Sequence, residues 1–98
     1  MLTLASQLQI HPEVVVTEMP GASGQEAVLL HLTTYQYFSL NTTGLRIWQL
    51  LAEPLPLAAV AGRLTEEYEL SLEQAQQAVL RLAQALLTEH LVDVVSPP

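Results

Sequence analysis

The stretch Ala27–Leu51, which reads AVLLHLTTYQYFSLNTTGLRIWQLL, decides the fold of this chain. It contains two apolar segments, Ala27–Leu32 and Gln36–Leu40, joined by a short polar loop, a pattern typical of a β-hairpin. Asn41 directly precedes an amphipathic segment, so we expect it to cap a helix over residues 42–52. Since the pattern beyond the hairpin is helical, the second strand is expected at a sheet edge, where backbone groups are free to pair with another peptide.

The length of the hairpin loop follows from the alternation of apolar residues. A three-residue loop, Thr33–Tyr35, places the apolar side chains of both strands on one face, where they are Val28, Leu30, Phe38 and Leu40. Such a loop requires a left-handed backbone at its last residue, Tyr35, which is unfavourable for a residue other than glycine. In this register Tyr37 and Ser39 direct their backbone N–H and C=O groups outward, because bonding direction alternates along an antiparallel strand.

The segments on either side of the hairpin complete the predicted fold. A two-residue apolar period from Leu8 to Val16, interrupted by Pro12, predicts another strand, and Pro20–Gly24 predicts a turn. Helices are expected over residues 57–68 and, after a capping box at Ser71, to about residue 89, while residues 91–95 form a short strand or an ordered tail. We therefore predict one α+β domain over residues 1–98, a winged-helix-like three-stranded antiparallel sheet followed by three helices.

The third predicted helix has an unusually wide apolar arc. At about 100° per residue, its centre is formed by Leu72, Ala75, Val79, Leu82 and Leu86. Ala78 and Ala85 flank one side of this arc, and Leu80 and Leu87 flank the other. Two interpretations remain open: the helix is wedged between two parts of the core, or one flank of the helix lines an open groove.

Composition excludes several classes of function. The chain has ten carboxylates, three arginines and no lysine, for a net charge of −7, which disfavours nucleic-acid and anionic-membrane partners and favours neutral or basic peptides. The absence of cysteine excludes disulfides and thiol catalysis. The three histidines are scattered without metal-type spacing, and no glycine-rich phosphate loop occurs. We expect no enzyme activity, metal or cofactor, and we expect a cytoplasmic protein, since signal-peptide and membrane-spanning patterns are lacking.

A family resemblance rests on the same decisive stretch. An apolar strand, a short turn, an aromatic-containing strand ending in Leu40-Asn41, and a Thr43-Gly44 helix start are similar to the pyrroloquinoline-quinone biosynthesis chaperone-like family, the precursor-peptide recognition elements. The resemblance covers roughly residues 8–95 and is greatest to the stand-alone leader-binding protein of lasso-peptide pathways. Two positions depart from the family pattern: Tyr35 replaces a common turn glycine, and Ala78 replaces an acidic residue often found in the third helix.

The resemblance implies peptide binding without catalysis. The leader segment of a ribosomally made precursor peptide is expected to add as a strand to the edge of the second hairpin strand and to lie against the third helix. The expected peptide-binding residues are Gln36, Tyr37, Phe38, Ser39, Leu40, Ala75, Ala78, Val79, Arg81 and Leu82. The resemblance also implies a separate cysteine leader peptidase or other modifying enzyme as partner, and we expect a monomer when peptide is bound. The alternative is a structural interaction subunit that dimerises, or holds a partner enzyme, through the same edge.

Overall fold

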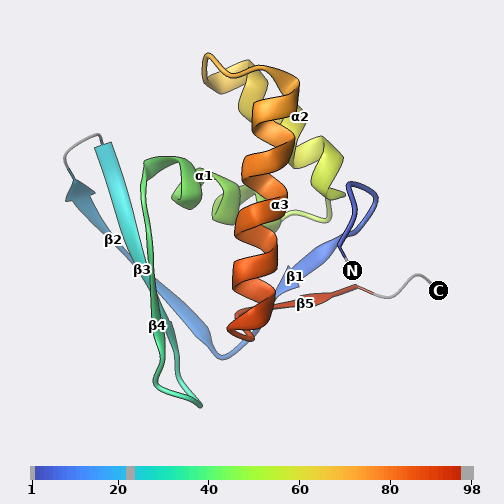
Figure 1. The fold of residues 1–98 in the computed structure, drawn as a ribbon. Coiled ribbons are helices and arrows are strands. Elements are labelled where there is room, and N and C mark those ends of the chain that lie inside the picture. The colour runs from blue at the N-terminus through green and yellow to red at the C-terminus, as the bar shows by residue number, and fades with distance from the viewer. Residues whose placement is uncertain (1, 22–23, 96–98) are drawn as a thin grey trace.

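The computed structural model describes residues 2–21 and 24–95 and has the predicted α+β architecture (Figure 1). Its elements in chain order are β1 (Leu8–Ile10), β2 (Val14–Gly21), β3 (Gly24–His31), β4 (Tyr37–Leu40), α1 (Thr42–Leu51), α2 (Leu57–Glu67), α3 (Leu72–Thr88) and β5 (Val92–Val94). A three-stranded antiparallel sheet in the order β2-β3-β4 is followed by the three helices, so the predicted fold class is confirmed. Figure 1 shows the three-stranded sheet at the left of the view, with the helices and the β1–β5 pair beside it.

The predicted register of the β3–β4 hairpin is wrong by one residue. Leu29 pairs with Phe38 and Leu30 with Tyr37, so the loop contains four residues, 32–35, instead of three. The prediction placed Leu30 inside and His31 outside, whereas Leu29 and His31 are buried. The Nδ1 atom of His31 accepts the N–H groups of Thr33 and Thr34 at 3.2 and 3.4 Å, so a buried polar side chain organises the turn.

Two features of the hairpin survive this correction. Tyr35 has the expected left-handed backbone, with φ of 61°. The His31 N–H donates to the Gln36 carbonyl at 2.9 Å. Because hydrogen-bonded and non-bonded pairs alternate along an antiparallel ladder, the next bonded pairs are Leu29–Phe38 and Ala27–Leu40. Phe38 and Leu40 therefore direct their backbone groups toward β3, and those of Tyr37 and Ser39 point outward.

The N-terminal strand prediction is corrected in two ways. The period from Leu8 to Val16 belongs to two strands, because β1 pairs with β5 in a separate two-stranded sheet whereas β2 pairs with β3. Pro20 and Gly21, expected in a turn, are the last residues of β2, and Gly24 is the first residue of β3; residues 22 and 23 lie outside the described part of the chain. Proline is tolerated there because β2 is an edge strand.

The predicted helices and their caps are confirmed. The Asn41 Oδ1 atom accepts the Gly44 N–H at 2.8 Å at the start of α1, and Ser71 and Gln74 form the predicted capping box of α3. The core lies where the three helices meet the inner face of the β3–β4 hairpin, with Leu29, Leu50 and Leu64 fully buried. Among the described residues, no helix combines the length and apolarity that crossing a bilayer requires.

Candidate peptide-binding groove between β4 and α3

The free edge of β4 lies beside two adjoining hollows that share Asn41 and Leu82. The first, of about 420 Å³, is lined by Glu26, Ser39, Leu40, Asn41 and Leu82. The second, of about 350 Å³, is lined by Asn41, Thr43, Ile47, Ala78, Arg81, Leu82 and Ala85. We call the two hollows together the β4–α3 groove. It combines unpaired strand groups with an apolar wall, the two features that strand addition with side-chain specificity requires.

Local sequence explains how β4 and α1 form one end of the groove. Leu40 is the last residue of β4 and is buried, and Asn41 turns the chain directly into α1 as its N-cap. Gly44 allows this close approach, because a Cβ atom there would lie 3.2 Å from the Asn41 Oδ1 atom and 3.3 Å from the Leu40 Cδ2 atom. The Leu-Asn-x-x-Gly sequence therefore fixes the strand relative to the helix that supplies Thr43 and Ile47 to the groove.

The wide apolar arc of α3 is divided between the core and the groove. The Ala78 and Ala85 flank lines the second hollow, whereas Leu80 and Leu87 on the opposite flank pack against the core. This arrangement supports the second interpretation, in which one flank of the helix lines an open groove. Leu72, predicted to belong to the centre of the apolar arc, does not face the core, because it is 52% exposed at the first residue of α3.

The structure brings together half of the predicted peptide-binding residues. Those that line the groove are Ser39, Leu40, Ala78, Arg81 and Leu82. Ala75 and Val79 are fully buried in the core, because they lie on the side of α3 that faces the other helices, so their side chains are not accessible to a ligand.

The three remaining predicted residues lie along the same strand but line neither hollow. Gln36 precedes β4 and is exposed, and Tyr37 is 74% exposed on the outer face of the sheet. Phe38 points to the other face and is half-buried against the core. Gln36 and Phe38 also direct their backbone groups toward β3, which leaves Tyr37 and Ser39 as the residues whose backbone groups are free to pair.

Sequence reasoning did not assign a binding role to several groove residues. They are Glu26, Asn41, Thr43, Ile47 and Ala85. Ala85 could have been found, because it lies seven residues after Ala78 and hence on the same flank of α3. Glu26 could not, because it reaches the groove only through the pairing of β3 with β4.

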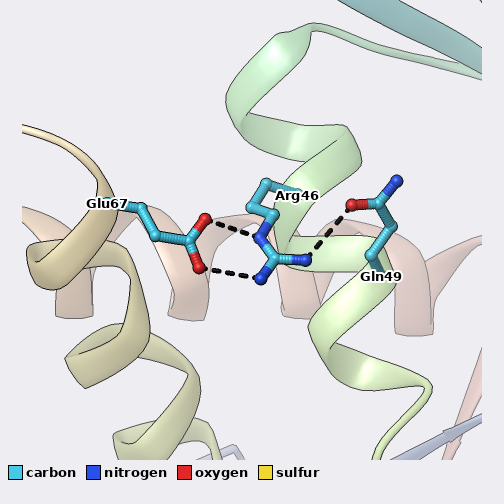
Figure 2. Close-up of polar contacts among 3 residues, drawn as sticks. All are labelled: Arg46, Gln49 and Glu67. Carbon is cyan, nitrogen blue, oxygen red and sulfur yellow. Dashed lines mark hydrogen bonds and ion pairs between the residues drawn. The ribbon is translucent and has the colours of Figure 1, made fainter.

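The charges near the groove are sparse. Arg81 is exposed, and Glu26 lines the neighbouring hollow. Outside the groove, Arg46 of α1 binds Glu67 of α2 through two hydrogen bonds of 2.6 and 2.7 Å and also contacts Gln49 (Figure 2). The bond to Arg46 lowers the pKa of the Glu67 carboxyl, and the same bond raises the pKa of Arg46. Across residues 2–21 and 24–95, no three metal-ligating side chains of the His, Cys, Asp or Glu type are grouped to hold an ion.

Comparison with known proteins agrees with this geometry. Residues 26–92, more than half of the chain, match the family described as Coenzyme PQQ synthesis protein D (PqqD), and the chain belongs to this family. No curated protein sequence matched the chain.

Two solved structures are similar to more than nine-tenths of the chain. One is described as TbiB1 in complex with the TbiA(beta) leader peptide; it is 28% identical, the match covers 91% of this chain and 99% of that one, and the TM-score is 0.77. The other is described as lasso peptide synthetase B1 complexed with the leader peptide; it is also 28% identical, the match covers 92% of this chain and 99% of that one, and the TM-score is 0.67. Both of these proteins carry a leader peptide.

Proposed function

We propose that this protein binds the leader segment of a ribosomally synthesised precursor peptide of the lasso type, without itself catalysing a reaction. The observation that carries the proposal is the free β4 edge beside an apolar groove. The PqqD family membership and the two leader-peptide complexes with similar folds support it. The bound leader is then delivered to a separate leader peptidase or modifying enzyme.

In this proposal the leader pairs with the outward N–H and C=O groups of Tyr37 and Ser39. Successive side chains of an added strand point to opposite faces of the sheet. One set of leader side chains therefore enters the β4–α3 groove against Ala78 and Leu82, and the other set lies on the outer face beside Tyr37. Backbone pairing supplies affinity, and the groove supplies selectivity.

The proposal is tested with synthetic leader segments of candidate precursor peptides, for which short reading frames beside this gene are to be searched. Light scattering after size separation should give a monomer that forms a one-to-one complex with the peptide. Hydrogen exchange should slow at the Tyr37 and Ser39 amides on binding, while the Phe38 amide, already bonded to β3, should change little. A dimer that ignores the peptide and protects the same amides would instead support a structural subunit that pairs through β4.

A further inference from the structure

Arg81 is the exposed cation of α3, and no carboxylate of that helix lies within one turn of it. Residues three and four positions away on a helix are its surface neighbours, and for Arg81 these are Gln77, Ala78, Gln84 and Ala85. Within the part of the chain that the structure describes, the ion pair found is Arg46–Glu67, and Arg81 makes no side-chain hydrogen bond. An exposed guanidinium needs no partner in water, so whether Arg81 affects ligand binding depends on the residues around it.

Those surroundings are the apolar half of the β4–α3 groove. Arg81 is the one charged side chain among the seven residues that line the second hollow; four of the others, Ile47, Ala78, Leu82 and Ala85, are apolar. Glu26 lines the neighbouring hollow with Ser39 and Leu40, and a smaller hollow of about 190 Å³ beside Asn41 and Thr43, but it does not line the second hollow. A peptide that fills the second hollow would remove water from around Arg81. No carboxylate among the residues that line this hollow would replace the lost water.

We propose that Arg81 makes the groove selective for a leader that carries an aspartate or glutamate side chain at the position facing α3. This inference rests on the proposed function and names the chemistry of the ligand. A carboxylate matches the guanidinium by two parallel hydrogen bonds, and a neutral side chain would leave the guanidinium partly desolvated without a partner. A lysine or arginine of the peptide at that position would be repelled, which adds discrimination.

The preference for an acidic leader residue applies only at Arg81 and is opposite to the preference that the net charge of the whole protein creates. With a net charge of −7, the long-range field attracts basic peptides. The single position facing Arg81 therefore has the opposite preference from the rest of the leader. A peptide C-terminus would offer the same carboxylate chemistry, but a leader that continues into a core peptide has no terminus at this point, so the experiment separates the two sources.

The test uses a displayed library of random twelve-residue peptides flanked on both sides, so that no free C-terminus is present. The library is selected on the wild-type protein, on Arg81→Gln, on Arg81→Glu and on Arg63→Gln. Arg63 is exposed on α2 and lines neither hollow of the groove, so its variant makes the same change of net charge elsewhere. Circular dichroism verifies that each variant is folded, which is expected since both arginines are exposed.

We expect peptides selected on the wild type and on Arg63→Gln to share an acidic residue at a fixed distance from an apolar anchor. The acidic preference should vanish with Arg81→Gln and become basic with Arg81→Glu. For one selected peptide, replacing the acid with its amide should weaken binding roughly tenfold to the wild type and less than about twofold to Arg81→Gln.

Two results would overturn the inference. The first would leave the proposed leader binding intact, and the second would also contradict it. Peptides that compete for the β4 edge but show no acidic position, or an acidic position indifferent to Arg81, would contradict the role of Arg81 and leave leader binding intact. If the flanked library selects nothing while peptides with a free C-terminus are selected, the site binds chain ends, and both the inference and strand addition by an internal leader fail.

Discussion

The two edges of the three-stranded sheet differ in what lies beside them. β2 is the longer edge strand, and two of its valines, Val15 and Val16, are more than 40% exposed. β4 is half as long, yet the groove lies along β4. The difference is that β3 and β4 pack against α1, and residues of β4 and α3 line one hollow, whereas β2 packs mainly on β3. A free strand edge offers pairing to any peptide; the neighbouring helices are what can make one edge selective.

The largest expected effect tests how the β4 side of the sheet is anchored. Leu29→Ala should lower the free energy of unfolding by roughly 2–5 kcal/mol, because it opens a cavity beneath β3. Leu30→Ala, on the half-buried outer face, should cost about 1 kcal/mol. Urea denaturation followed by circular dichroism measures both. A larger loss for Leu30→Ala would favour the register predicted from the sequence.

Next in size is a block placed in the groove. Ala78→Glu should weaken leader binding by roughly ten- to a hundredfold, because its side chain fills the second hollow and its carboxylate, three residues before Arg81, competes with the leader for the guanidinium. Ala58→Glu is the matched control, since residue 58 is exposed on α2 and lines neither hollow. Calorimetry that finds the two variants equal would remove this flank of α3 from the site.

A proline on each edge compares the strands directly. Ser39→Pro removes an outward N–H of β4 and should weaken leader binding by roughly tenfold. On β2 the Leu32 N–H donates to the Glu13 carbonyl at 2.8 Å, so by alternation the Val16 N–H also points outward. Val16→Pro should therefore perturb folding about as little as Ser39→Pro and leave binding unchanged. Weakened binding by Val16→Pro alone would move the docking edge to β2.

The smallest effect concerns the ion pair between α1 and α2, which lies outside the groove. Glu67→Gln should lower the free energy of unfolding by about 0.5 kcal/mol near neutral pH, since about a third of each side chain is exposed and water screens the pair. The pKa of Glu67 is lower in the folded protein, so the pair stabilises above the unfolded-state pKa and loses its contribution as pH falls through the folded-state pKa. The difference between wild type and variant should therefore shrink in acid, with unchanged leader affinity throughout; a difference that grows in acid would contradict the assigned pKa direction.

The sequence by itself determined the elements that depend on near neighbours. Caps at Asn41 and Ser71, the three helices, the left-handed Tyr35 and the α+β class all follow from residues within a few positions of one another. The position of β4 at a sheet edge also followed, because only helical patterns come after it until the last few residues. The edge half of the site was therefore predictable.

Tertiary structure alone decided which of two neighbouring, chemically equivalent residues faces the core. Leu29 and Leu30 are identical in hydrophobicity, yet Leu29 is buried together with His31. The His31 ring lies beside that of His11, with centroids 4.8 Å apart, so residues from two separate parts of the chain meet there. The same holds for α3, where Ala75 and Ala78 are the same residue type, yet one is buried and the other lines the groove. Periodicity defines a helix face only to within a residue or two, and the packing of α2 and β5 against α3 decides which of its residues are buried and which remain open to a ligand.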